Sequence, residues 1–238
     1  MKALILNSGS GLRMGDITED TPKCMTELVT GETLLSRQIR QLENAGVTQI
    51  CITTGPFVDK LEDHARGCAR SAELTFVNNP DYATTNIIYS VFLAKHHCDD
   101  DLVLLHGDLV FDDDVLTDLL LNPHSAAIVS STMPLPKKDF KAVIVGGLIS
   151  LVGVEFFDNA VAMQPLYKLT QACWRTWGDG IEAFIAAGNR TCYAEAALNS
   201  VSSHCAIFPF DVKDRLCAEV DTPDDLAAID AVLGGSPR

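Results

Sequence analysis

The chain begins with a short apolar run that leads directly into a loop rich in glycine. Residues 3–6 (Ala-Leu-Ile-Leu) are typical of a strand buried on both faces of a parallel sheet. Three glycines follow within residues 9–15, and glycine lets backbone N–H groups approach an anion without an intervening Cβ. Arg13 and Lys23 add two cationic side chains to the same region. This opening therefore predicts a buried strand followed by a cradle for a triphosphate.

Two common phosphate-binding motifs do not fit this loop. The dinucleotide fingerprint G-x-G-x-x-G opens a helix, whereas here the third glycine is Gly15 and Arg13 stands where helix packing requires a small residue. The Walker sequence G-x-x-x-x-G-K-[ST] does not occur in the chain. What remains is G-x-G-x-R-M-G with a downstream Pro-Lys.

Composition narrows the class of protein. The chain has 238 residues, of which 47% are hydrophobic, and nothing in it resembles a linker or a repeat, so we expect one α/β domain spanning residues 1–238. The net charge of −14 argues against a nucleic acid or an anionic membrane as partner. No apolar run reaches the ~18 residues of a membrane span, and residues 1–3 begin a strand rather than a signal peptide. We therefore expect a cytoplasmic protein.

The eight cysteines form no C-x-x-C pair. Several lie in apolar or helical surroundings, where a free cysteine behaves as a small hydrophobic residue. We therefore expect all eight to be reduced and no zinc site.

Strand and helix patterns alternate along the chain. Strands are expected at 3–6, 49–53, 74–77, 101–106, 126–131, 142–145, 148–157 and 191–194, and helices at 33–45, 58–70, 84–96, 165–187 and from 222 onward. Repeated β-α units predict a doubly wound, mainly parallel, Rossmann-like sheet with helices on both faces, and the second half adds antiparallel strands.

Several candidate residues follow the predicted strands directly. Ligands of such sheets bind beyond the carboxyl ends of the strands, where the glycine loop, Thr54 and Asp108 are expected to meet. Asp221 ends a short strand pattern and supplies a second carboxylate, and Mg²⁺ is commonly held by one or two carboxylates together with phosphate oxygens. Residues 112–114 (Asp-Asp-Asp) are better explained as negative charge at a helix N-terminus, and Trp174 and Trp177 as packing.

Three segments resemble one known family. Residues 6–15 with Thr21-Pro22-Lys23, then His106-Gly107-Asp108, then Glu219-Val220-Asp221-Thr222 are similar to the sugar-phosphate nucleotidyltransferase-like superfamily, and most of all to the cytidylyltransferases that act on phosphocholine or 2-aminoethylphosphonate. Relatives usually have Ala-Ala-Gly where this chain has Asn-Ser-Gly at 7–9. That variant resembles phosphonate cytidylyltransferase-like sequences and favours this branch.

The resemblance implies a role for each matching position. Arg13 and Lys23 would bind the triphosphate and stabilise the charge at the α-phosphorus, and Asp108 and Asp221 would hold Mg²⁺. The residues assigned to the nucleotide are Leu6, Asn7, Ser8, Gly9, Gly11, Thr54, Thr85 and Asn86. The acceptor is an anion and needs further positive charge, for which Lys138 and Lys168 are the candidates, and if it also carries a primary ammonium, Asp139 or Glu195 should pair with that group.

The sequence thus predicts a Mg²⁺-dependent cytidylyltransferase that joins CTP to a small phosphonate or phosphate, with 2-aminoethylphosphonate as the leading acceptor, and releases pyrophosphate. Three alternatives stay open: a phosphocholine cytidylyltransferase, a sugar-1-phosphate nucleotidyltransferase that uses another triphosphate, and a non-catalytic nucleotide-binding regulator. A homodimer is also expected.

Overall fold

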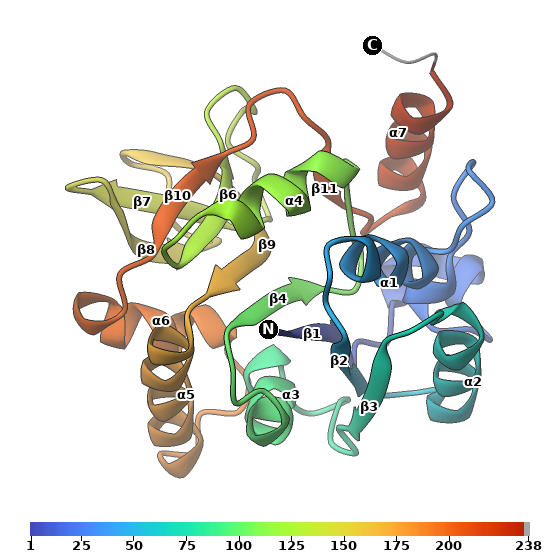
Figure 1. Ribbon diagram of the computed structural model, residues 1–238, viewed down its shortest axis with the longest axis horizontal. Coiled ribbons are helices and arrows are strands. Elements are labelled where there is room, and N and C mark those ends of the chain that lie inside the picture. The colour runs from blue at the N-terminus through green and yellow to red at the C-terminus, as the bar shows by residue number, and fades with distance from the viewer. Residues whose placement is uncertain (236–238) are drawn as a thin grey trace.

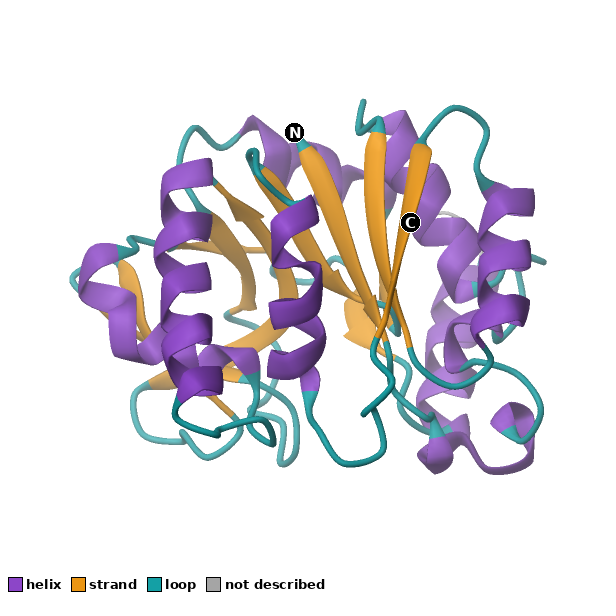
Figure 2. Cartoon of the chain, turned by 90° about the horizontal axis from the view of Figure 1, so that it is seen from below, coloured by secondary structure: helices purple, strands orange, loops and turns teal. Residues whose placement is uncertain are grey.

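A mixed sheet runs through the centre of the computed structural model, which describes residues 1–235 (Figures 1 and 2). Residues 236–238, which belong to the predicted domain, lie outside the described residues. Seven strands form the main path in the order β10-β6-β9-β4-β1-β2-β3. Their bounds are β1 Lys2–Asn7, β2 Gln49–Thr54, β3 Glu73–Asn78, β4 Leu102–His106, β6 Ala126–Ser130, β9 Ala160–Leu169 and β10 Phe208–Asp211.

Six of these strands run the same way. β3, β2, β1 and β4 are parallel neighbours, β9 is inserted antiparallel between β4 and β6, and β10 is parallel to β6. The hairpin of β7 (Lys141–Val145) and β8 (Leu148–Gly153) extends the sheet beside β9. A separate two-stranded sheet joins β5 (Leu109–Phe111) to β11 (Cys217–Glu219). The predicted fold class, mainly parallel with antiparallel strands in the second half, is confirmed.

Helices cover both faces of the sheet (Figure 2). Alternate residues of a strand point to opposite sides, so a strand that is apolar throughout presents a hydrophobic surface to the helices on each face. Leu4 of β1 belongs to a core cluster with α3, α5 and α6, whereas Ile5 belongs to a cluster with α1, α2 and α4. Trp174 and Trp177 of α5 are buried in the first cluster, which confirms their packing role. The helices are α1 Leu34–Asn44, α2 Val58–Cys68, α3 Ile87–Ala94, α4 Asp113–Leu121, α5 Gln171–Ala186, α6 Ala194–Val201 and α7 Pro223–Gly234, and short 3₁₀ turns lie at Leu12–Thr18, Lys23–Met25, Lys95–His97 and Ser202–His204.

Polar caps set where the helices begin. Thr33 caps α1 and Thr222 caps α7, each in a reciprocal capping box, and Asn86 caps α3 through its side chain. Asp112 is the N-cap position of α4, and Asp113 accepts hydrogen bonds from Arg40 and Gln41. The acidic run at 112–114 therefore lies at a helix N-terminus, as predicted.

Two predicted elements are wrong. The helix expected at 165–187 begins only at Gln171, and residues 165–169 belong to β9. Pro165 falls where the β6–β9 register shifts between Ala127 and Val129, an irregularity that accommodates a residue without an N–H donor inside a strand. The strand expected at 191–194 is also absent among the described residues, where α6 begins at Ala194.

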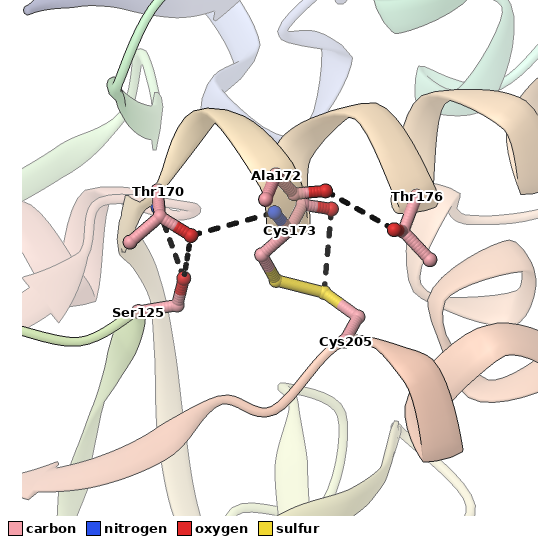
Figure 3. The surroundings of a disulfide bond; sticks show 6 residues. All are labelled: Ser125, Thr170, Ala172, Cys173, Thr176 and Cys205. Atoms are coloured by element: carbon pink, nitrogen blue, oxygen red, sulfur yellow. Dashed lines mark hydrogen bonds between the residues drawn. A yellow bond between two sulfur atoms is a disulfide. The ribbon is translucent and has the colours of Figure 1, made fainter.

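One disulfide contradicts the expectation of eight reduced cysteines. Cys173, in the first turn of α5, is bonded to Cys205, which precedes β10 (Figure 3). The bond links segments that are 32 residues apart in the sequence. The remaining cysteines, all in the described part of the chain, are free.

Within residues 1–235, none of the helices combines the length and the apolar character needed to cross a bilayer.

Candidate active site

Two adjoining pockets open at the carboxyl ends of β1 and β4. The loop pocket, about 300 Å³ in volume, is lined by the glycine loop of residues 6–13 and by residues 22–24. The aromatic pocket, about 280 Å³, extends from the same loop to the start of α3, to Phe140 and to Tyr193. Asp108 and Asp221 line both pockets, so these two carboxylates stand at the boundary between them.

Two glycines let the backbone close around the loop pocket. Gly11 has φ +68°, and a Cβ there would lie only 3.0 Å from the Cβ of Lys23. A Cβ at Gly107 would overlap the side-chain amide of Asn7. A side chain at Gly11 would therefore press against Lys23, and a side chain at Gly107 would force apart Asn7 and the segment that carries Asp108.

A compact charge cluster occupies the boundary between the pockets. The Lys23 Nζ donates to Asp108 Oδ2 at 2.7 Å and to Asp221 Oδ1 at 2.6 Å. The Arg13 Nη2 lies 2.8 Å from the same Asp221 oxygen. Burial lowers the pKa of Lys23, but the two carboxylates outweigh burial and hold this pKa above its ordinary value. Burial likewise raises the pKa of Asp108, and the charge of Lys23 more than reverses the effect.

Pairing between β5 and β11 brings the two carboxylates together. Glu219 lies opposite Leu109 in this antiparallel pair, and the Val220 N–H donates to the Asp108 carbonyl at 2.9 Å. Asp108 and Asp221 are more than a hundred residues apart in the sequence, yet both contact one lysine nitrogen. The structure therefore brings the two predicted metal ligands to one point.

The donor set at this point suits a hard divalent cation. Asp108 Oδ1 is buried and has no hydrogen-bond partner among the described residues. Ligand atoms of His106, Asp108 and Glu219 lie within 4.8 Å of one another, which offers further donors beside the aspartate pair. Carboxylate oxygens are the protein ligands that Mg²⁺ prefers, so Asp108 and Asp221 fit the predicted ion.

A second buried pair lies beside the cluster. The His106 Nδ1 is 3.1 Å from Glu219 Oε1, and both residues line the aromatic pocket. Burial raises the pKa of Glu219 to about 6. Burial lowers the pKa of His106, but the hydrogen bond to Glu219 and the charge of Glu219, with smaller contributions from Asp108 and Glu195, outweigh burial and raise it. Neither residue was predicted as a site residue, although Glu219 shares the strand face of Asp221.

The predicted nucleotide residues divide between the pockets. Leu6, Asn7, Gly9 and Gly11 line the loop pocket. Ser8, Thr85 and Asn86 line the aromatic pocket, together with Leu6 and Gly9.

Thr54 is an exception among the predicted nucleotide residues. Its side chain is fully buried and donates to Asn78 Oδ1 at 3.3 Å. The preceding residue, Thr53, lines the aromatic pocket and accepts a hydrogen bond from the Asn7 N–H. Successive side chains of a strand point to opposite faces, so the prediction selected the wrong member of the pair.

The predicted acceptor residues also divide. Lys138 and Asp139 line the aromatic pocket. Lys168 and Glu195 do not line it: Lys168 donates to the Asn122 carbonyl at 2.8 Å, and Glu195 accepts a hydrogen bond from the Tyr167 hydroxyl at 2.8 Å.

Each of these two misplacements has a structural cause. Lys168 lies on β9 opposite Val103, about 10 Å along β4 from the His106 end where the pockets open. Residues 165–169, which were expected to begin a helix, belong to β9. Glu195 is 2% exposed, and burial raises its pKa. Its charge also helps to raise the pKa of His106.

Aromatic residues that the sequence did not indicate form the far wall of the aromatic pocket. The rings of Phe140 and Tyr193 meet edge to face with their centres 4.9 Å apart, and Phe140 also packs against His106. Tyr82, Asn79 and other residues near the start of α3 complete the lining. Isolated aromatic residues in different segments carry no sequence signal that they will meet.

The sheet order, the glycine loop and the paired aspartates define a nucleotide-binding α/β protein of the nucleotidyltransferase type. The chain belongs to the MobA-like NTP transferase domain family, whose model matches residues 3–199.

Two proteins are similar to this chain in sequence, and one solved structure is similar in fold. The CMP-5'-(3-aminopropyl)phosphonate synthase of Streptomyces rubellomurinus is 33% identical over 183 residues, which cover 74% of this chain and 29% of that protein. The CTP:phosphoglutamine cytidylyltransferase of Campylobacter jejuni is 30% identical over 135 residues, which cover 54% of this chain and 52% of that protein. The structure of CTP:phosphocholine cytidylyltransferase from Streptococcus pneumoniae superimposes with a TM-score of 0.76 at 17% identity and covers 98% of both chains, which shows a shared fold.

The two relatives found by sequence are longer than the matched regions. The aligned residues span 29% of the first relative's length and about half of the second's.

Proposed function

We propose that this protein is a Mg²⁺-dependent cytidylyltransferase that joins CTP to a small aminoalkylphosphonate, with 2-aminoethylphosphonate as the leading acceptor, and releases pyrophosphate. The observation that carries the proposal is the contact of Lys23 with both Asp108 and Asp221 beside the glycine loop. The names of the two sequence relatives describe a CMP-phosphonate synthase and a CTP-dependent cytidylyltransferase, which supports cytosine as the base.

The proposed reaction needs no protein nucleophile. An oxygen of the acceptor, already anionic, forms a bond to the α-phosphorus of CTP, and the bond from that phosphorus to the bridging oxygen of pyrophosphate breaks. Arg13 and Lys23 would offset the negative charge that gathers on the phosphoryl oxygens, because both side chains line the loop pocket. Mg²⁺ held by Asp108 and Asp221 would supply charge neutralisation and orient the phosphates.

The nucleoside would enter the aromatic pocket beside the start of α3. Thr85 and Asn86 lie there with Leu6, Ser8 and Gly9 of the loop. The Asn86 oxygen accepts from the Ile87 N–H, and the Thr85 hydroxyl donates to the Asp81 carbonyl and accepts from the Asn79 amide, so the protein itself fixes the orientation of both side chains at the pocket.

The remaining wall of the aromatic pocket favours an ammonium group on the acceptor. Burial raises the pKa of Asp139 and of Glu219, and neither carboxylate has a lysine or arginine partner in the described part of the chain. A substrate ammonium would give Asp139 a cationic partner and would add a second cation beside Glu219, which already contacts His106. Lys138, which lines the same pocket, would contact the phosphonate.

Phosphocholine is the second candidate acceptor. The edge-to-face pair of Phe140 and Tyr193 offers aromatic surface of the kind that binds quaternary ammonium groups. The primary amine is preferred because two carboxylates face the pocket and can accept its N–H groups, which a quaternary ammonium lacks. A sugar-1-phosphate would leave Asp139 without a cationic partner, and a non-catalytic regulator would not need paired aspartates around a lysine.

A pyrophosphate-release screen tests the proposal. Each of the four ribonucleoside triphosphates is combined with 2-aminoethylphosphonate, phosphocholine or a sugar-1-phosphate, with Mg²⁺ or with excess chelator. We expect release with CTP and 2-aminoethylphosphonate that disappears with chelator. Release only with a sugar phosphate, or with no pair at all, would contradict the proposal.

Two further proposals concern the setting of the reaction. We place it in the cytoplasm, because its nucleotide donor is an intracellular metabolite. The homodimer stays a prediction, which analytical ultracentrifugation of the full chain would test.

A further inference from the structure

The ammonium of Lys23 lies where a cation shared by Asp108 and Asp221 would lie. It is 2.7 Å from one carboxylate and 2.6 Å from the other, and its side chain is 14% exposed. The guanidinium of Arg13 also contacts the Asp221 oxygen that Lys23 contacts. One oxygen of each aspartate is therefore already neutralised by the protein's own cations.

We propose that Lys23 occupies the divalent-cation position in the nucleotide-free protein, so that the metal ion enters together with the triphosphate and not before it. This inference rests on the proposed function, which assigns the metal to Asp108 and Asp221. It adds a second role for Lys23, as the ion that excludes free metal from the empty site.

Electrostatics supports this order of binding. A divalent cation approaching the two aspartates would meet the charge of Lys23 at short range, in a partly buried site where water screens poorly. The triphosphate brings several negative charges into the loop pocket, which Lys23 and Arg13 both line. These two side chains would then exchange carboxylate oxygens for phosphate oxygens and free both aspartates for the metal.

The surroundings of the cluster make Lys23 a necessary counterion in the empty site. Asp139 and Glu219 line the same pocket as Asp108 and Asp221, and the charge of Asp221 adds to burial in raising the pKa of Asp139. Removing the positive charge of Lys23 would leave these carboxylates with Arg13, whose side chain is 62% exposed. A protein without the lysine charge should therefore attract a divalent cation from solution.

Manganese binding to the nucleotide-free protein tests the inference. The electron paramagnetic resonance signal of free Mn²⁺ measures binding without any requirement for activity, and Mn²⁺ accepts the same oxygen ligands as Mg²⁺. We expect Lys23→Gln to bind Mn²⁺ at least about tenfold more tightly than the wild type in the absence of nucleotide, a factor that corresponds to roughly 1.4 kcal/mol. The wild type should reach similar affinity only when CTP is added. Lys137→Gln, which removes an exposed neighbouring lysine that lines neither pocket, should behave as the wild type.

Two results would overturn the inference, and they are distinguishable. Equal Mn²⁺ affinity of the wild type and Lys23→Gln, with binding abolished by Asp221→Asn in both, would show that Lys23 does not exclude the ion while the metal site stands. Binding to Lys23→Gln that survives Asp221→Asn would refute the metal assignment itself, and with it that part of the proposed function. Circular dichroism checks that each variant is folded, and Lys23→Met repeats the measurement if Lys23→Gln is not.

Discussion

The loop pocket and the aromatic pocket adjoin each other but are built in different ways. Most of the loop pocket comes from one continuous stretch, residues 6–24, to which the fold adds residues 107–108 and Asp221. The aromatic pocket draws on separate segments that include the start of α3, the end of β4, residues 138–140, Val154 and Tyr193. Phosphate binding needs backbone N–H groups and cations, which a single loop can supply, whereas the shape of a small acceptor needs walls from several directions.

The two pockets also differ in the state of their carboxylates. Lys23 lowers the pKa of Asp108, at the loop pocket, below its ordinary value despite burial. In the aromatic pocket, burial raises the pKa of Asp139 and of Glu219. The carboxylates at the boundary of the loop pocket thus have Lys23 and Arg13 as counterions, whereas Asp139 in the aromatic pocket forms no ion pair among the described residues and would pair with a cationic ligand. This contrast teaches that the first pocket is suited to an anion and the second to a molecule with a positive end.

The largest expected effect comes from the cation of the loop pocket. Lys23→Met should lower kcat about 10²- to 10³-fold, which corresponds to a loss of about 3 kcal/mol of transition-state stabilisation. Steady-state pyrophosphate release measures the change, with Lys137→Met as the matched control. Full turnover by the Lys23 variant would mean that the loop pocket does not supply the cation that stabilises the transition state.

The next effect sharpens the assignment of the aromatic pocket. Glu219→Gln keeps the size of the side chain and its contact with His106 but removes the charge that an ammonium would pair. We expect kcat/KM for 2-aminoethylphosphonate to fall about 10- to 100-fold, a change of ~2 kcal/mol, with KM for CTP nearly unchanged. Glu73→Gln, on the far strand β3, is the control. An equal rise in both KM values would contradict a role of Glu219 that is specific to the acceptor.

A third prediction concerns a carboxylate that lines neither pocket. Glu43 is nearly buried, and its Oε1 accepts hydrogen bonds from the N–H groups of Arg70, Ser71 and Ala72. Burial alone would raise the pKa of Glu43, but these bonds outweigh it and lower the pKa to about 2.

The lowered pKa determines how the contribution of Glu43 to the free energy of unfolding changes with pH. The stabilisation by Glu43 is fully present above its unfolded pKa of ~4.3 and is lost as the pH falls through about 2. Glu43→Gln should therefore lower the free energy of unfolding by about 2 kcal/mol at pH 7 and by much less near pH 2, without changing kcat. Urea unfolding at several pH values measures the difference. A difference that is constant with pH would contradict the hydrogen-bonded carboxylate.

The smallest effect is expected at Lys168, which was predicted to bind the acceptor but lies outside both pockets. Its amine donates to the carbonyls of Asn122 and His124. Lys168→Met should lower the free energy of unfolding by about 1 kcal/mol and leave both KM values unchanged. A selective rise in the KM for the acceptor would mean that Lys168 does contact the acceptor and that the aromatic pocket extends to this residue.

Local patterns predicted the fold well where each strand or helix has its own hydrophobic periodicity and its own capping residues. Thr33 and Thr222 cap helices that begin where the sequence indicates. The errors lie where tertiary contacts override a local signal, as in β9, which tolerates Pro165 because the pairing with β6 shifts there. Cys173 and Cys205 show no spacing motif and meet only because α5 packs beside the segment that enters β10.

The sequence by itself determined the glycine loop, its two cations and the succession of strands that places this loop at the carboxyl edge of a parallel sheet. These features depend on neighbours along the chain, through backbone freedom at glycine and the periodicity of buried side chains. Only the tertiary structure decided that Lys23 contacts both aspartates, that Thr53 rather than Thr54 faces the pocket, and that Glu219, Phe140 and Tyr193 line one pocket. The physical reason is that charge pairing and pocket shape depend on distances between segments, which the pairing of β5 with β11 and the packing of the helices set.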